Sequence, residues 1–354
     1  MSRFFVSKYN ALEPYTPGEQ PKDMQYVKLN TNESPFPPSQ KAQDAAYDAA
    51  KRLALYSDPE CRELVKKASE LFNIELDEIL FTNGSDEILN FAFMAFCDIK
   101  TPAVFPDITY GFYPVFADLN GVPYKLLPLK SDFSICADDY VSAGGTIFIA
   151  NPNAPTGLAL SLEDIEKIVK GNPENVVVID EAYVDFGAES AVSLIHKYDN
   201  LLVTQTFSKS RSMAGARLGF GIGSKALIRD LNTIKYSTNP YNVNSMTMAA
   251  GIGTLCDEEY THKNCKEIIR VRENTKKALK ELGFTMTDSL ANFIFAKSDK
   301  IDGKKLYLRL KDKGVLVRHF EKKRLSDYNR ITVGSEEQMN ILLEKIKEIL
   351  EEEK

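Results

Sequence analysis

The sequence predicts an α/β protein with a mostly parallel central sheet and a smaller α+β domain. Short apolar runs alternate with helical segments over the first two thirds of the chain, and such alternation builds parallel sheets covered on both faces. Polar clusters follow directly after several of these runs. Beyond about residue 240 the pattern changes to a long polar helix followed by short strands and helices.

The central sheet is predicted from apolar, β-branched runs bounded by turn residues. These strands are 79–81, 103–105, 146–150, 176–179, 201–204 and the glycine-rich run 219–223. Helices are predicted before the first of these strands at 39–55 and 60–72, and between later ones at 88–96 and 161–170. Because ligands of such sheets bind outside the carboxyl ends of the strands, we expect the polar clusters to meet there.

The remaining elements define the predicted domains. After residue 240 we expect helices 257–282 and 303–313, strands 292–296, 315–318 and 330–333, and a closing helix that begins with a capping box at Ser335. Residues 1–38 are rich in proline and tyrosine and are predicted to be an arm packed against the small domain. The large domain is then 39–240 and the small domain 241–354.

Composition excludes several classes of function. The 354 residues carry a net charge of −6 without a long basic cluster, so no nucleic-acid or anionic-membrane partner is indicated. No apolar run approaches the roughly 20 residues that span a bilayer, and no signal peptide is recognised. The five cysteines lack C-x-x-C spacing, which favours free thiols in the cytoplasm over a metal site or disulfides.

Lys209 is the first catalytic candidate. It follows the apolar run 201–204 and lies among the small polar residues Thr206, Ser208 and Ser210. A lysine at the end of a buried strand loses part of its solvation, which lowers its pKa and leaves some of it as free amine. Schiff-base chemistry with a carbonyl requires such an amine.

Asp180 is the second candidate, because it ends the apolar strand 176–179. A carboxylate buried there without a partner would cost several kcal/mol, and a protonated heterocyclic nitrogen would offset that cost. The alternative is a nucleotide hydrolase in which Asp180 and Glu181 hold magnesium. That alternative needs a G-x-x-x-x-G-K-[ST] loop, which the sequence lacks.

A phosphate site is predicted from two further clusters. Arg217 offers a planar, charged fork suited to phosphate, and Ser208 adds a hydroxyl beside the lysine. Gly84 permits a tight turn, after which Ser85 is expected to cap a helix whose first N–H groups, near Asp86, face an incoming anion. An amine for an aldimine, a carboxylate for a pyridinium and a phosphate cradle together describe pyridoxal phosphate.

Three motifs resemble those of the fold-type I aminotransferases, which depend on pyridoxal phosphate. They are NPNAPTG at 151–157, DEAY at 180–183 and S-K-x(7)-R at 208–217. Four further stretches narrow the resemblance to the histidinol-phosphate aminotransferases: KLNTNESPFPPS at 28–39, TNGSDE at 82–87, GVLVRHF at 314–320 and NRITVGS at 329–335. The resemblance spans nearly the whole chain.

This resemblance implies roles for the residues around the cofactor. Lys209 would be the Schiff-base lysine and proton shuttle, and Asp180 would keep the pyridinium protonated so that the ring is an electron sink. Tyr183 would hydrogen-bond the phenolic oxygen, and Tyr110 would lie against the ring face. The residues implied to cradle the phosphate are Ser85, Asp86, Thr206, Ser208 and Arg217.

The resemblance also implies substrate and partner contacts. Arg330 would clamp the substrate carboxylate by a bidentate pair, and Arg318 and Tyr15 would add specificity for a phosphate ester. Tyr56 would reach the phosphate bound by the partner subunit, so a homodimer with a shared active site is expected.

The sequence departs from the family pattern at one position. The family usually has an asparagine directly before Pro-Thr-Gly that donates to the phenolic oxygen, and here that position is Ala154. Asn153, one residue earlier, is the predicted substitute, with Tyr183 alone as the alternative.

The implied activity is ping-pong transamination through a Lys209 aldimine. It would exchange an amino group between the pair glutamate and 2-oxoglutarate and the pair histidinol phosphate and imidazole acetol phosphate, in L-histidine biosynthesis. An aromatic amino-acid aminotransferase and a threonine-phosphate decarboxylase are alternatives with the same cofactor. A protein of this fold that only binds or regulates is a further alternative, and the intact Lys209 and Asp180 argue against it.

Overall fold

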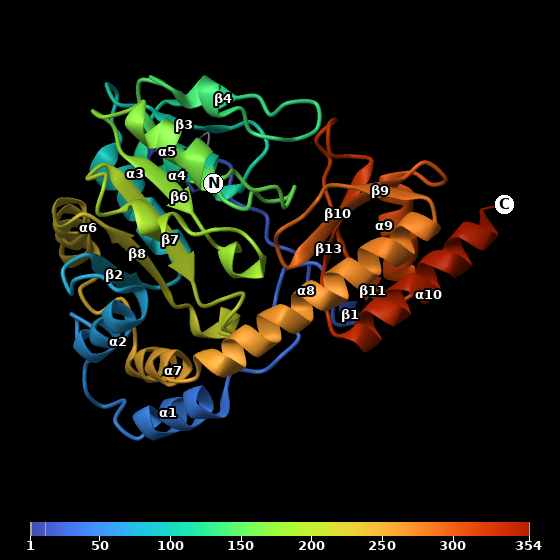
Figure 1. Ribbon diagram of the computed structural model, residues 1–354, viewed down its shortest axis with the longest axis horizontal. Coiled ribbons are helices and arrows are strands. Elements are labelled where there is room, and N and C mark those ends of the chain that lie inside the picture. Colours follow the sequence, from blue (N-terminus) through green and yellow to red (C-terminus); the bar gives the residue numbers. More distant parts are fainter. Residues whose placement is uncertain (1, 11, 354) are drawn as a thin grey trace.

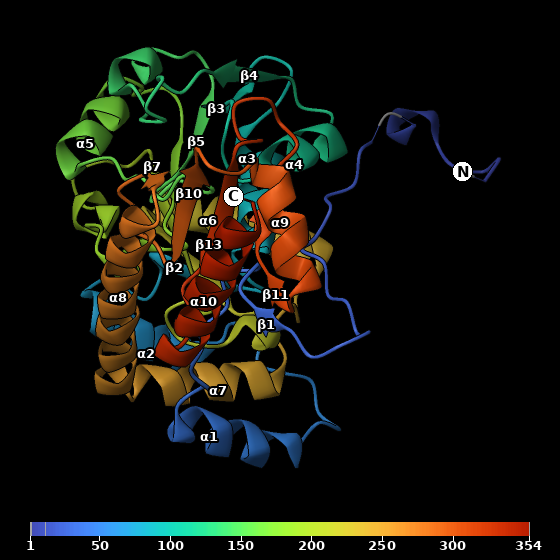
Figure 2. The same ribbon diagram turned by 90° about the vertical axis from the view of Figure 1, so that its right-hand side faces the viewer.

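The computed structural model describes residues 2–10 and 12–353. A large domain built around a sheet lies beside a smaller domain, and the long helix α8 (Glu258–Glu281) runs from one to the other (Figure 1). The N-terminal segment extends away from the body of the molecule before the chain returns to the small domain (Figure 2).

The large sheet has the strand order β2-β8-β7-β6-β5-β3-β4 within the described residues. The strands are β2 (Ile79–Thr82), β3 (Ala103–Pro106), β4 (Tyr124–Leu127), β5 (Thr146–Ala150), β6 (Val177–Asp180), β7 (Leu201–Thr206) and β8 (Gly219–Gly223). Neighbours are parallel except for β8, which is antiparallel to both β2 and β7. The predicted α/β class with a mostly parallel sheet is confirmed, and β2, β3, β5, β6 and β7 end at one edge.

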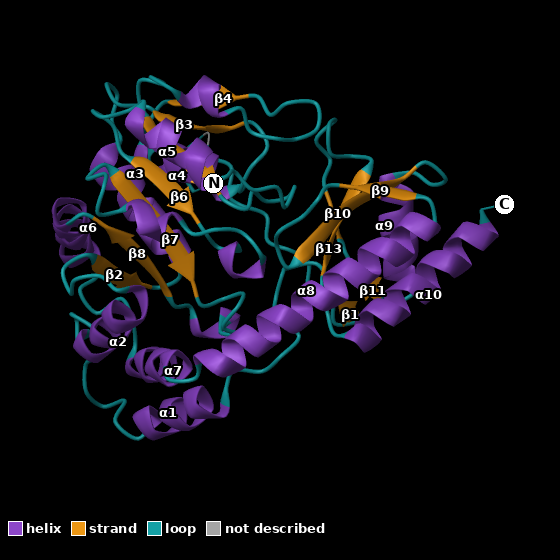
Figure 3. Ribbon diagram, in the orientation of Figure 1, coloured by secondary structure: helices purple, strands orange, loops and turns teal. Residues whose placement is uncertain are grey.

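Helices cover both faces of this sheet (Figure 3). The helices of the large domain are α1 (Gln40–Ala50), α2 (Arg62–Phe72), α3 (Ser85–Phe96), α4 (Phe112–Asn120), α5 (Leu162–Lys170), α6 (Lys225–Thr238) and α7 (Ser245–Leu255), and α1 packs on α7. Successive strand residues point to opposite faces. Val177 and Ile179 therefore pack into the cluster that includes α5, while Val178 packs into the cluster with α3 and α4. Both faces are buried, which explains the uninterrupted apolar runs.

The small domain contains an antiparallel sheet with the order β12-β13-β10-β9. Its elements are β9 (Phe284–Met286), β10 (Phe293–Ser298), α9 (Gly303–Asp312), β11 (Val315–Leu316), β12 (Arg318–His319), β13 (Tyr328–Thr332) and α10 (Glu336–Glu352). The predicted strand 315–318 is two pieces, because β11 pairs with the arm strand β1 (Val27–Lys28) and β12 pairs with β13. The capping box is formed by Ser335 and Gln338.

Two features bear on the division into domains. The arm adds β1 alongside β11, and Leu29 belongs to the core of the small domain. Helix α7 instead packs with α1 and α2, and its buried residues Met248, Ala250 and Leu255 join a core cluster of the large domain. We therefore propose a boundary between α7 and α8 in place of one at residue 240.

Candidate active site

A pocket lies at the carboxyl edge of the large sheet. It is lined by Ser85, Asp86, Tyr110, Ala150, Ala154, Asp180, Ala182, Tyr183, Thr206, Ser208, Lys209 and Arg217. These residues follow or end strands β2, β3, β5, β6, β7 and precede β8. The parallel sheet therefore brings together nine of the side chains predicted from the sequence, although up to 132 positions separate the first, Ser85, from the last, Arg217.

Lys209 projects from the loop after β7. Its Nζ donates to the carbonyl oxygen of Thr31 at 3.2 Å and lies 5.9 Å from the centre of the Tyr183 ring. Burial lowers the pKa of Lys209 to about 8, and the positive charge of Arg330 contributes to the same shift. A substantial fraction of this amine is therefore neutral near pH 8, as nucleophilic chemistry requires.

Asp180 is buried at the end of β6. Its carboxylate accepts hydrogen bonds from the Tyr113 hydroxyl at 3.0 Å and from Thr204 Oγ1 at 3.3 Å. Burial raises the pKa of Asp180 to about 6, and these hydrogen bonds oppose that rise. A buried carboxylate that is still largely ionised at pH 7 favours a cationic or proton-donating ligand.

The adjacent carboxylate has a different surrounding. Glu181 accepts hydrogen bonds from Ser190 Oγ at 2.6 Å, from Ala191 N at 2.6 Å and from Gln205 Nε2 at 2.8 Å. It is therefore held by structural contacts and does not line the pocket with Asp180. This arrangement does not support the alternative in which both carboxylates hold magnesium. Among residues 2–10 and 12–353, no group of three or more His, Cys, Asp or Glu side chains is placed to hold a metal ion.

An anion cradle lies at the start of α3. Arg217 Nη2 donates to Asp86 Oδ2 at 2.8 Å, and the Tyr110 hydroxyl donates to Asp86 Oδ1 at 2.6 Å. Gly84 has φ +76°, and a Cβ at that position would lie 2.5 Å from Arg217 Nη2. A Cβ on Gly219 would lie 2.4 Å from the backbone nitrogen of Ser85. Both glycines thus keep space open around the guanidinium and the first helical N–H.

The prediction that Ser85 caps α3 is wrong. Gly84 is the N-cap residue, Ser85 is the first residue of the helix, and no side-chain cap bond is formed. The Ser85 hydroxyl therefore remains available to the pocket. Nearby, the backbone nitrogen of Ser208 donates to Thr206 Oγ1 at 3.1 Å, and the two hydroxyls of these residues lie 3.0 Å apart.

Three predicted substrate contacts lie beside the pocket. Arg330 on β13 donates from Nη2 to the Asn30 carbonyl at 3.1 Å, while its buried Nε has no partner among the described residues. Arg318 donates to the carbonyl oxygens of Thr16 and Pro17 at 3.3 and 3.4 Å. Tyr15 belongs to the same arm, and its ring stacks on Phe112 at 4.2 Å and lies 6.4 Å from Tyr110.

Two other residues predicted for the cofactor site, Asn153 and Tyr56, do not line this pocket. The Asn153 amide nitrogen donates to the Ile108 carbonyl at 3.0 Å and to Thr156 Oγ1 at 3.2 Å, and Asn153 does not line the pocket. The turn directs the Asn153 side chain toward the loop after β3, so this structure lends no support to Asn153 as the substitute for the missing asparagine, and that role stays a prediction. Tyr56 stacks on Tyr241 and leaves 84% of its surface exposed, outside its own pocket.

Sequence reasoning missed two contacts of the pocket. Tyr113 is buried on α4 and bonds Asp180, 67 positions away. Asn32 is buried in the arm, and its Nδ2 donates to the Tyr183 hydroxyl at 3.0 Å. Tyr113 carries no local signal beyond being a tyrosine on an apolar helix. Asn32 lies within the family-like stretch 28–39, but that stretch does not indicate which of its polar side chains contacts the pocket.

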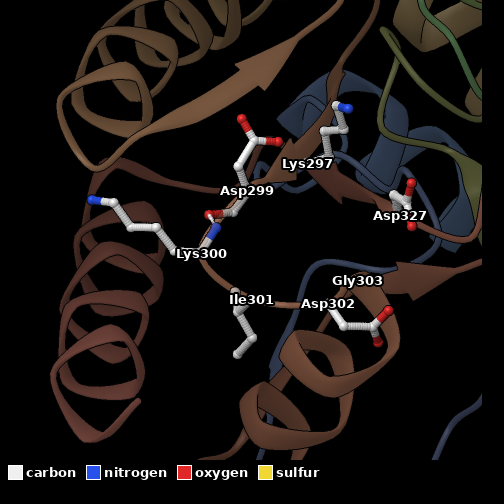
Figure 4. Close-up of a pocket in the computed structure, with 8 residues that line it drawn as sticks. Lys297, Asp299, Lys300, Ile301, Asp302, Gly303 and Asp327 are labelled. Carbon is white, nitrogen blue, oxygen red and sulfur yellow. Dashed lines mark hydrogen bonds between the residues drawn. The ribbon is translucent and has the colours of Figure 1, made fainter. Parts of the chain in front are cut away.

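A second hollow lies in the small domain (Figure 4) and shares no lining residue with the pocket at the sheet edge. It is lined by residues 297–303 and Asp327. Asp302 accepts a hydrogen bond from Lys305 N as the cap of α9, and Lys300 Nζ donates to the Leu282 carbonyl. Its side chains thus take part in local structure, and we assign no function to it.

Comparison with known proteins identifies the family. A family model described as "Aminotransferase class I and II" matches residues 24–346. A histidinol-phosphate aminotransferase of Brachyspira hyodysenteriae (strain ATCC 49526 / WA1) is 51% identical over 352 residues, covering 99% of each chain. The chain belongs to the class I and II aminotransferases. The resemblance to this family and the prediction of an aminotransferase are confirmed.

Further relatives agree with this assignment. A histidinol-phosphate aminotransferase of Clostridium botulinum (strain 657 / Type Ba4) is 47% identical over 351 residues, again covering 99% of each chain. The crystal structure of histidinol-phosphate aminotransferase from Sinorhizobium meliloti in complex with pyridoxal-5'-phosphate has a TM-score of 0.91 and covers 99% of each chain. Because the two sequences are 21% identical, this similarity shows a shared fold and nothing further.

Proposed function

We propose that this chain is a pyridoxal-phosphate-dependent histidinol-phosphate aminotransferase. In histidine biosynthesis it transfers an amino group from glutamate to imidazole acetol phosphate, with 2-oxoglutarate and histidinol phosphate as products, and the reaction is reversible. The single observation that carries the chemistry is that Lys209, Asp180 and the Asp86–Arg217 pair line one pocket. The substrate is supported by the names of the relatives that are 51% and 47% identical over nearly the whole chain.

The pocket fits the cofactor in three respects. Lys209 offers an amine with a lowered pKa for the carbonyl carbon. Asp180 is a buried carboxylate that lacks a cationic partner in its hydrogen-bond set and suits a ring nitrogen that carries a proton. The glycines beside Arg217 and Ser85 leave space for a phosphate. When bound, pyridoxal phosphate supplies an electron sink for the substrate α-carbon.

Each residue then has a defined task. The Lys209 amine, once free, takes the proton from the substrate α-carbon, and its pKa of about 8 suits a proton transfer near neutral pH. The Asp180 carboxylate holds the proton on the ring nitrogen, and Tyr113 and Thr204 hold the carboxylate. Tyr183, whose pKa burial raises, keeps its hydroxyl proton for hydrogen bonding.

Substrate recognition is assigned to the arm and the small domain. Arg330 has a buried Nε without a partner among the described residues, which suits an incoming carboxylate or phosphate. Arg318 donates to the Pro17 carbonyl of the arm, and Tyr15 of the same arm stacks on Phe112 of the large domain. We assign Arg318 and Tyr15 to the phosphate ester of the substrate.

The proposal includes a homodimer located in the cytoplasm. Leu55 and Tyr56 leave 71% and 84% of their surfaces exposed, so both side chains are accessible to a partner subunit. Tyr56 would then complete the phosphate site of the partner subunit. In the described part of the chain, no helix is both long and apolar enough to cross a membrane.

The test is an absorbance titration of the purified protein with pyridoxal phosphate, followed by histidinol phosphate without a keto acid. The proposal expects a bound-cofactor band that histidinol phosphate converts to the pyridoxamine form. Lys209→Ala should lose the band and the turnover, while the exposed Lys197→Ala retains both. Conversion by phenylalanine or tyrosine and not by histidinol phosphate would move the assignment to an aromatic aminotransferase. Turnover that survives Lys209→Ala would refute the mechanism.

A further inference from the structure

We propose that Asn32 is a positioning residue that orients the Tyr183 hydroxyl toward the bound cofactor. This inference rests on the proposed function, because it concerns how Tyr183 meets pyridoxal phosphate. It assigns a role in the cofactor site to a residue of the N-terminal arm, which lies outside the large domain that carries Lys209 and Asp180.

Hydrogen bonds to residues of the small domain hold both the backbone and the side chain of Asn32. Its backbone nitrogen donates to Thr332 Oγ1 at 2.9 Å, and its carbonyl oxygen accepts from Asn292 Nδ2 at 3.0 Å. The Thr332 hydroxyl donates to Asn32 Oδ1 at 3.1 Å. The side chain is 1% exposed, and the backbone adopts φ +55°, a conformation that asparagine tolerates better than most residues. The small domain therefore fixes this side chain in one orientation.

The network also sets the direction of the hydrogen bond to Tyr183. Because Asn32 Oδ1 accepts from Thr332, the amide group that faces Tyr183 is Nδ2, which can only donate. The Tyr183 oxygen accepts this bond at 3.0 Å, so its own proton remains free to donate to a ligand. Burial raises the pKa of Tyr183, which keeps that proton in place.

Three other residues near Tyr183 offer no side-chain donor to an oxygen on the cofactor ring. Ala154 and Ala182 line the same pocket and have no hydrogen-bonding side-chain group. Asn153 directs its amide nitrogen to the Ile108 carbonyl. Among these four residues, Tyr183 is thus the one that can donate to an oxygen on the cofactor ring, and Asn32 decides where its proton points.

The experiment is a double-mutant cycle of Asn32→Ala and Tyr183→Phe. Two quantities are measured: the pKa at which the absorbance of bound pyridoxal phosphate changes, and the Kd of the cofactor. A donor to the phenolic oxygen stabilises its negative charge, so losing the donor raises this spectral pKa. We expect Asn32→Ala to raise it, and to weaken cofactor binding about threefold to tenfold, the range for one neutral hydrogen bond. In the Tyr183→Phe background, Asn32→Ala should change neither quantity further.

Two variants keep the test decisive. Asn32→Asp preserves the shape and the Thr332 contact but replaces the donor by an acceptor that captures the Tyr183 proton, so its spectral pKa should rise at least as far as in Asn32→Ala. Asn30→Ala is the matched control, since Asn30 is equally buried in the arm and bonds the Glu19 carbonyl instead of Tyr183. Its spectral pKa should equal that of the wild type, and urea unfolding of each variant checks that it is folded.

Two results would overturn the inference. One is additive effects of Asn32→Ala and Tyr183→Phe, and the other is a spectral pKa in Asn32→Ala and Asn32→Asp equal to that of Asn30→Ala. A wild-type protein that binds no pyridoxal phosphate would instead refute the proposed function, so the two failures are distinguishable.

Discussion

Replacing Gly84 by alanine tests the anion cradle most directly. Gly84 has φ +76° and ψ 167°, a backbone region that is essentially restricted to glycine. The new Cβ would lie 2.5 Å from Nη2 and 3.0 Å from Cζ of Arg217. Because those atoms are the far end of a flexible side chain, the guanidinium can swing away. It then leaves Asp86, with which it pairs at 2.8 Å.

The expected magnitudes follow from these contacts. Strain at Gly84 costs about 1–3 kcal/mol of unfolding free energy, and the lost Arg217–Asp86 pair adds about 0–1 kcal/mol because both side chains are partly exposed. The larger effect is on phosphate binding. A hydrogen bond to a charged group contributes about 1.5–3 kcal/mol, so the Kd of pyridoxal phosphate should rise about 10- to 150-fold.

Gly121→Ala is the matched control. Gly121 also has a positive φ, +70°, at the end of α4, but a Cβ there would meet no atom within 4 Å. It should cost about 1–2 kcal/mol of stability and leave the cofactor Kd unchanged. Urea unfolding measures the stability of both variants, and absorbance titration measures both Kd values. Equal Kd values in Gly84→Ala and Gly121→Ala would refute the cradle.

Three further predictions concern the surroundings of the site. Tyr113→Phe removes a hydrogen bond that lowers the pKa of Asp180, so the pKa of Asp180 should rise above about 6. The acid limb of the kcat–pH profile should then move to higher pH, and a limb that does not move would contradict this prediction. Arg211→Gln removes the guanidinium that pairs with Asp185 at 3.3 Å. We expect urea unfolding to show that the free energy of unfolding falls by about 1–3 kcal/mol, and an unchanged free energy would contradict this prediction. Arg318→Ala should raise the KM for histidinol phosphate about tenfold or more and change the KM for glutamate much less. Equal changes in the two KM values would show that Arg318 does not recognise the phosphate.

Much of the cofactor pocket could be predicted because its residues follow strands of one parallel sheet. Lys209, Asp180 and Ser85 each come within five residues of the end of an apolar run, and the carboxyl ends of β7, β6 and β2 share an edge. Local sequence therefore sufficed to place these side chains together. The lowered pKa of Lys209 also follows from its position at the end of a buried strand.

The course of a single turn could not be predicted in the same way. Asn153 and Ala154 are adjacent in sequence, yet Ala154 lines the pocket while Asn153 faces the Ile108 carbonyl. Which of the two points inward depends on the backbone dihedrals of the turn, and these are set by the strands and loops packed around it. The residue types alone favoured the polar side chain.

By itself, the sequence determined the fold class, the family and the residues at the strand ends, since all three depend on short-range patterns and ordered motifs. Only the tertiary structure decided which distant side chains support them. Tyr113 meets Asp180 because α4 packs on the sheet, and Asn32 meets Tyr183 because β1 pairs with β11 and Thr332 holds the arm. Such contacts join segments 67 to 300 positions apart, and they are fixed by packing between elements, which local sequence does not encode.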